Sequence, residues 1–100
     1  MAGFHLTQAA KADLKAIGRY TEKKWGRLLR NTYLTMLDQC FYDLADEFLK
    51  GQDWNEICPG YRKHSAGRHL VFYRQIPADA VEIVRILHDR MDVERQISES

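Results

Sequence analysis

The sequence predicts an α+β fold in which an antiparallel helical hairpin packs on an antiparallel β-meander, preceded by a short N-terminal strand. Apolar residues recur every three or four positions through the first half of the chain, which is the period of an α-helix. Beyond about residue 60 the period changes to two, which indicates strands. At 100 residues the chain has the length of one small domain, so we expect a single domain over residues 1–100.

Two consecutive helices account for the first apolar pattern. After a short extended piece at 3–6, Thr7 has the hydroxyl side chain that caps a helix N-terminus. The first helix then runs to Gly26, and its apolar face comprises Ala10, Leu14, Ile17, Thr21 and Trp25. The second runs from Arg27 to Gly51 with Leu29, Tyr33, Met36, Leu37, Cys40, Phe41, Leu44 and Phe48. A connection as short as Gly26 makes the helices antiparallel, which predicts a hairpin over about residues 7–50.

The segment 51–60 contains two glycines and a proline and has no period, so it is predicted to be a loop. We expect this loop to hold Trp54 or Ile57 against the core. Three strands follow as a meander over about residues 61–88, at 61–65, 68–75 and 80–88.

The last of these strands is apolar on both faces, which is typical of an interior strand. The period of two places Val81, Ile83 and Leu87 on one face and Val84, Ile86 and His88 on the other. In the C-terminal tail, 92–100, we expect a helical turn over 92–97 capped by Asp92, and frayed residues at 98–100.

The composition is that of a globular protein, with 45% hydrophobic and 29% charged residues, and the formal net charge is +1. The charges are nevertheless segregated: 11–30 and 61–75 are basic, and 43–56 is acidic. Along the first helix, a basic residue recurs every four positions at Lys11, Lys15, Arg19, Lys23 and Arg27. This band is either a solvated face or a surface for nucleic acid or an acidic protein.

Nucleic-acid binding is the weaker of these interpretations. The chain has no helix-turn-helix signature, and a protein that binds single strands should present aromatics on a basic surface rather than within helical apolar stripes. We therefore expect no direct sequence-specific binding to nucleic acid.

Cys40 and Cys58 form neither a CxxC motif nor a disulfide framework. Without a signal peptide or an apolar run of membrane-spanning length, the chain is expected to be cytoplasmic, with reduced thiols and no membrane association. His64 and His69 lie too far along other strands to form a metal site with His88, so the sequence predicts no metal site, and we expect no cofactor.

The predicted strands also carry four arginines, whose planar guanidinium groups suit carboxylates and phosphates: Arg62, Arg68, Arg74 and Arg85. Such residues serve either to protect sheet edges or to bind a partner or a phosphate. His88 has a side chain suited to acid–base chemistry, although a lone histidine at the end of a strand is more often structural.

Several segments resemble the ParE toxins of the RelE/ParE superfamily. They are "LTQAAKADLKAI", "YTEKKWG", "PGYRKHSAGRHLVFYR" and "VEIVRILHDRMD", and the resemblance extends from about Phe4 to Gln96. The resemblance implies the toxin of a bacterial type II toxin–antitoxin pair that poisons DNA gyrase. It also implies a ParD-like antitoxin that silences the toxin by laying its C-terminal segment over it in a hetero-oligomer.

The neighbouring RelE branch cuts messenger RNA on the ribosome, and a nuclease of this type could use Arg68 and His88. However, Asp89 follows His88 where many such nucleases carry a tyrosine, and a carboxylate there would repel the scissile phosphate. The resemblance therefore favours inhibition by binding, without catalytic residues. A non-toxic interaction module of the same fold remains a third interpretation.

Within the favoured interpretation, we expect two groups of contact residues. The antitoxin is expected to contact Arg19, Arg68, Arg74 and Arg85, and the target to contact His88, Arg90 and Met91.

Overall fold

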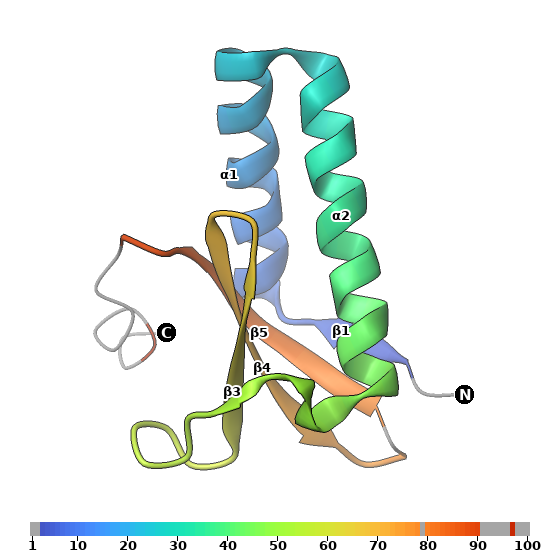
Figure 1. The fold of residues 1–100 in the computed structure, drawn as a ribbon, viewed down its shortest axis with the longest axis vertical. Helices are drawn as coiled ribbons and strands as arrows, with labels where there is room; N and C mark the ends of the chain where they lie inside the picture. The colour runs from blue at the N-terminus through green and yellow to red at the C-terminus, as the bar shows by residue number, and fades with distance from the viewer. Residues whose placement is uncertain (1–2, 79, 91–96, 98–100) are drawn as a thin grey trace.

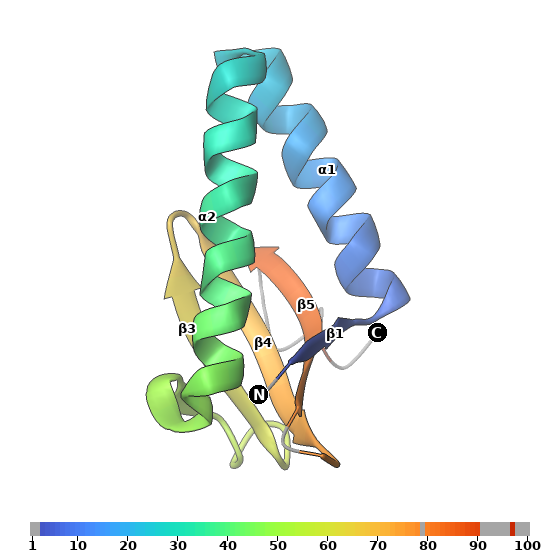
Figure 2. The same cartoon turned by 90° about the vertical axis from the view of Figure 1, so that its right-hand side faces the viewer.

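The computed structural model describes residues 3–78, 80–90 and 97. Two helices lie on one face of a five-stranded mixed sheet, as Figures 1 and 2 show. The order along the chain is β1 (Phe4–Leu6), α1 (Gln8–Trp25), α2 (Arg27–Asp46), the 3₁₀ turn η1 (Phe48–Lys50), β2 (Gln52–Asp53), β3 (Tyr61–Ala66), β4 (His69–Ile76) and β5 (Ala80–His88). The order across the sheet is β1-β5-β4-β3-β2.

The predicted helical hairpin is confirmed, and its ends are defined by local chemistry. The hydroxyl oxygen of Thr7 accepts a hydrogen bond from the backbone N–H of Ala10 at 3.0 Å, so this residue caps α1 as expected. Gly26 has a φ of 94°, a conformation that favours glycine, and links the two helices without any further residue. Figure 2 shows the helices meeting at this end and diverging toward the sheet.

The C-terminal boundary of α2 lies earlier than predicted. The helix ends at Asp46 rather than at Gly51. The hydroxyl of Tyr73 donates to the carbonyl of Phe48 at 2.6 Å and accepts from the N–H of Gly51 at 2.8 Å. A residue of the sheet thus binds backbone groups that a continuing helix would use itself, and the chain turns into the short strand β2 within the predicted loop.

The sheet has the predicted meander, β3-β4-β5, with antiparallel pairing throughout. The N-terminal strand β1 pairs in parallel with β5, with Phe4 opposite Val81. This parallel pair makes β5 an interior strand, as its two apolar faces predicted, and it makes the sheet mixed rather than purely antiparallel.

A β-bulge in β5 changes which side chains share a face. Phe72 lies opposite Arg85 whereas Tyr73 lies opposite Ile83, so Val84 is an extra residue on β5. The predicted grouping is therefore wrong beyond the bulge, because one extra residue reverses the alternation. Ile86 packs with Val81 and Ile83 in the cluster on the helical side, and Leu87 packs on the other side.

The sheet separates two apolar clusters. The larger lies between sheet and helices, and the smaller lies on the opposite face and contains Trp54, Phe72, Leu87 and Ile97. Of the two loop residues considered for the core, Trp54 is buried and Ile57 is exposed. The helical turn predicted over 92–97 falls, apart from Ile97, outside the described residues, as do the predicted frayed residues 98–100.

The free end of the hairpin departs from the predicted apolar faces. Trp25 is 60% exposed and Leu29 is 47% exposed, because this end projects past the strands, as Figure 1 shows. Within the part of the chain that the structure describes, neither α1 nor α2 has an apolar stretch that could cross a bilayer.

Candidate functional site

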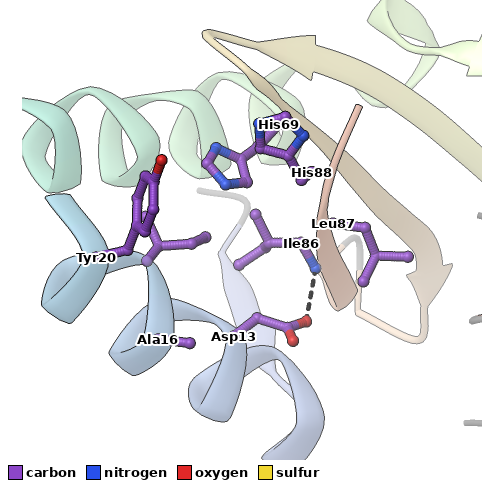
Figure 3. Close-up of a pocket in the computed structure, with 8 residues that line it drawn as sticks. Asp13, Ala16, Tyr20, His69, Ile86, Leu87 and His88 are labelled. Carbon is purple, nitrogen blue, oxygen red and sulfur yellow. Dashed lines mark hydrogen bonds between the residues drawn. The ribbon is translucent and has the colours of Figure 1, made fainter. Parts of the chain in front are cut away.

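Two adjoining hollows lie between α1 and the ends of β4 and β5, and we call them together the α1–sheet groove. They have volumes of about 210 and 380 Å³ and share Tyr20, His69 and His88. Figure 3 shows the first hollow, with Asp13 and Tyr20 on α1 facing the two histidines and Ile86 on the sheet. The second hollow continues past Tyr33 to the exposed end of the hairpin, at Trp25 and Leu29.

Asp13 fixes α1 to the sheet at the base of the groove. Its carboxylate accepts hydrogen bonds from Nε and Nη2 of Arg85, at 2.8 and 3.0 Å, and from the backbone N–H of Ile86 at 2.9 Å. Both charged side chains are largely buried, and the hydrogen bond to Asp13 raises the pKa of Arg85. Ile86 lies beyond Ile83, the last residue of β5 that pairs with β1. Asp13 on α1 therefore provides the hydrogen-bond acceptor for a backbone N–H at the edge of β5 that β1 no longer covers.

His69 and His88 form the wall of the groove on the sheet side. They lie opposite each other on β4 and β5, with ring centroids 5.4 Å apart. Burial and the nearby charge of His88 lower the pKa of His69, which keeps its imidazole neutral at neutral pH.

Tyr33, on α2, fixes the orientation of His69. Its hydroxyl lies 2.6 Å from Nδ1 of His69 and accepts a hydrogen bond from the backbone N–H of Arg68 at 3.1 Å. The hydroxyl also lies 3.4 Å from the carbonyl oxygen of Ala66, so it donates either to that carbonyl or to Nδ1 of His69, according to the tautomer of the imidazole. Burial raises the pKa of the Tyr33 hydroxyl, so it remains a donor.

Cations line the outer part of the groove. Lys24, Arg68 and Arg90 are exposed and line the second hollow. The ammonium group of Lys24 lies over the rings of Tyr20 and Trp25, 5.6 and 5.7 Å from their centroids. Positive charge beside aromatic rings suits a ligand that combines negative charge with flat or apolar groups.

The structure brings three of the predicted contact residues into this groove, namely Arg68, His88 and Arg90. The others lie elsewhere. Arg19 lines a separate hollow between the two helices, and Arg74, six positions after Arg68 in the sequence, pairs with Glu82 at 2.8 Å. The guanidinium of Arg85 is bound by Asp13, and Met91 lies outside the described residues.

Sequence reasoning missed the pairing of His69 with His88, which it placed too far apart for a common site. Counting back from the β4–β5 turn with regular pairing puts His69 opposite Leu87, and the bulge at Val84 moves it opposite His88. Tyr33 was interpreted as a packing residue of the second helix. Among the described residues, no three His, Cys, Asp or Glu side chains are arranged to hold a metal ion.

Comparisons with known proteins agree with this architecture. A family described as "ParE toxin of type II toxin-antitoxin system, parDE" matches residues 4–93. The chain is 40% identical over 92 residues to Toxin ParE1 of Mycobacterium tuberculosis, covering 92% of this chain and 94% of that protein. It is 36% identical to Toxin ParE1 of Caulobacter vibrioides with the same coverage, and 32% identical over 99 residues to Toxin ParE of Escherichia coli, covering 99% and 96%.

A solved structure, titled "Chromosomal ParDE TA system from P. aeruginosa", has the same fold. Its TM-score to this chain is 0.73 at 20% identity, over 88% of this chain and 96% of that one. The RelE/ParE-like arrangement expected from the sequence is thereby confirmed.

Proposed function

The chain belongs to the ParE toxin family of type II toxin–antitoxin systems, and from this premise we propose that it inhibits DNA gyrase and is neutralised by a ParD-like antitoxin. The family match over residues 4–93 carries the proposal. Gyrase is the target that the resemblance to ParE toxins implies.

The composition of the groove supports inhibition by binding. Its exposed cations, Arg68 and Arg90, attract a partner, and its aromatic walls supply apolar contact area. Oδ1 of Asp89 lies 3.2 Å from Nδ1 of His88. A carboxylate at this distance disfavours a scissile phosphate beside the histidine.

Neutralisation is proposed to occur by occlusion. Arg68, assigned to the antitoxin, lines the same groove as His88 and Arg90, assigned to the target with Met91. An antitoxin segment bound at Arg68 would therefore cover target-binding residues. Arg19 is exposed and available to extend that contact. Arg74 is exposed but pairs with Glu82, and a partner carboxylate would have to displace Asp13 in order to reach Arg85.

A gyrase supercoiling and cleavage assay with the purified protein tests the proposal. We expect supercoiling to be inhibited and cleaved DNA to accumulate, and both effects to disappear when the cognate antitoxin is added. Arg90→Ala should weaken inhibition about tenfold or more, whereas Lys11→Ala, which removes an exposed charge outside the groove, should not. Unchanged gyrase activity at saturating protein would refute the target assignment.

A ribosome-dependent messenger RNA endonuclease is the second candidate, because the structure brings Arg68, His69 and His88 into one groove. A histidine and an arginine could supply proton transfer and phosphate binding. Cleavage of message on purified ribosomes, lost in His88→Ala, would establish this activity. Normal growth on expression without antitoxin would instead favour a non-toxic interaction module.

A further inference from the structure

The free end of the helical hairpin exposes large aromatic side chains. Tyr20 is 61% exposed and Trp25 is 60% exposed. Both line the second hollow of the α1–sheet groove, which we call the outer hollow. In a small protein, contiguous exposed rings of this size indicate a binding surface. The sequence had placed Trp25 on an apolar stripe, and this placement was one argument against nucleic-acid binding.

The surface around these rings is positively charged. Lys24, Arg68 and Arg90 line the outer hollow, whose described lining includes no carboxylate. The carboxylate of Asp89 lies beside His88 at this hollow, so the three cations remain in excess and a phosphate is favoured near them rather than at the histidine. Lys23 and Arg27, at the free end of the hairpin, are exposed as well. Two copies of this basic surface would repel each other, so a second copy of the chain is a poor occupant.

We propose that the outer hollow binds single-stranded nucleic acid, with bases stacked on Trp25 and Tyr20 and phosphates held by Lys24, Arg68 and Arg90. Exposed aromatic rings beside cations are the combination that single-stranded nucleic acids require, because every base has a flat π-face and every linkage a negative charge. A duplex hides its base faces, and an acidic peptide would use the cations without requiring flat rings. This activity is distinct from gyrase inhibition, although Arg68 and Arg90 also belong to the surfaces proposed for the antitoxin and for gyrase.

Binding of a fluorescein-labelled dT15 oligonucleotide to the purified full-length protein, measured by fluorescence anisotropy, tests the proposal. We expect dT15 to bind at least tenfold more tightly than a duplex of the same length. With three phosphate contacts, the logarithm of the affinity should fall with the logarithm of salt concentration with a slope of about −2. Bases stacked on the exposed Trp25 should also quench tryptophan fluorescence, while the buried Trp54 remains unaffected.

Two pairs of variants separate stacking from charge. Trp25→Leu keeps an apolar side chain without a π-face and should weaken dT15 binding at least about fivefold, with recovery in Trp25→Phe. Tyr42→Leu, at a 48% exposed aromatic on α2, is the matched control. Lys24→Gln should make the salt slope shallower by about 0.7, whereas Lys11→Gln, on the same helix outside the groove, should leave it unchanged.

Three results would overturn the proposal. One is the absence of dT15 binding at low salt, and another is equal affinity for a duplex. The third is competition by an oligo-glutamate of equal charge together with an unaltered affinity in Trp25→Leu, which would assign the surface to an acidic peptide. Because these assays contain no gyrase, their outcome does not depend on the proposed target.

Discussion

His69 and His88 face each other across β4 and β5 with ring centroids 5.4 Å apart, and they do so because Val84 is bulged out of the pairing between these strands. The bulge also turns Ile86 toward the helices, so this side chain lies under the histidine rings, as Figure 3 shows. One extra residue in a strand thus determines what the groove presents to a ligand.

Stability should fall between neutral and mildly acidic pH because of His69. Burial, reinforced by His88, lowers its folded-state pKa below the usual 6.5, so the unfolded chain binds a proton at a higher pH than the folded chain does. The free energy of unfolding therefore decreases as the pH falls from about 7 through the folded-state pKa, and then levels off. Urea unfolding between pH 5 and 8 measures this slope.

The variant His69→Gln should flatten that pH dependence in part. It should not remove it, because burial also lowers the pKa of His64 and contributes in the same direction. His5→Gln, at an exposed position, controls for loss of an imidazole. If stability depended on pH as steeply in His69→Gln as in the unaltered protein, the assignment of this pH dependence to His69 would be wrong.

Asp13→Asn should lower the free energy of unfolding by about 3 kcal/mol, because it removes the carboxylate that accepts two hydrogen bonds from the largely buried guanidinium of Arg85. The matched control is Glu82→Gln, which breaks an ion pair of the same 2.8 Å length in which Arg74 is half exposed. That change should cost less than about 1 kcal/mol. Equal losses in the two variants, measured by urea unfolding, would disprove the anchoring role of Asp13.

Tyr73→Phe should destabilise the protein by about 1 to 3 kcal/mol. It removes the hydroxyl that binds both the carbonyl of Phe48 and the N–H of Gly51, in a residue with no solvent exposure. Thermal unfolding followed by circular dichroism measures the effect. Tyr42→Phe, which deletes the hydroxyl of a half-exposed tyrosine, should change stability by less than about 0.5 kcal/mol.

Thr7→Ala should reduce stability by more than the roughly 1 kcal/mol that an ordinary helix cap contributes. The hydroxyl caps α1 and also donates to the carbonyl of Val84 at 2.7 Å, at the bulge. Thr7→Ser keeps the hydroxyl and should recover most of the loss. A Ser variant as unstable as the Ala variant would show that the methyl group, rather than the hydroxyl, matters.

Local chemistry made much of the fold predictable. The cap at Thr7, the single-residue connection at Gly26 and the change of period after residue 60 each depend on neighbouring residues alone. The early end of α2 could not be foreseen, because it depends on Tyr73, 25 residues from Phe48 in the sequence. The same holds for the parallel pairing of β1 with β5, which no local pattern encodes.

The groove was harder to predict than the fold. Arg68, His88 and Arg90 were proposed as contact residues from their residue types and the family resemblance, and the structure brings them together in one hollow. The exposure of Trp25 was missed because helical periodicity shows which residues share a face but not whether a partner covers that face along its whole length. The binding of Arg85 by Asp13 joins residues 72 positions apart, beyond any pattern of spacing.

The parallel pairing of β1 with β5 also governs when the fold can be completed during synthesis. Thr7 and Val84 are joined across 77 residues, so closing this contact is entropically costly and must await the last strand. A nascent chain can form its helical hairpin early, but it has neither the bulge nor His88 until β5 has been synthesised. The order of synthesis therefore delays assembly of the groove until β5 has left the ribosome.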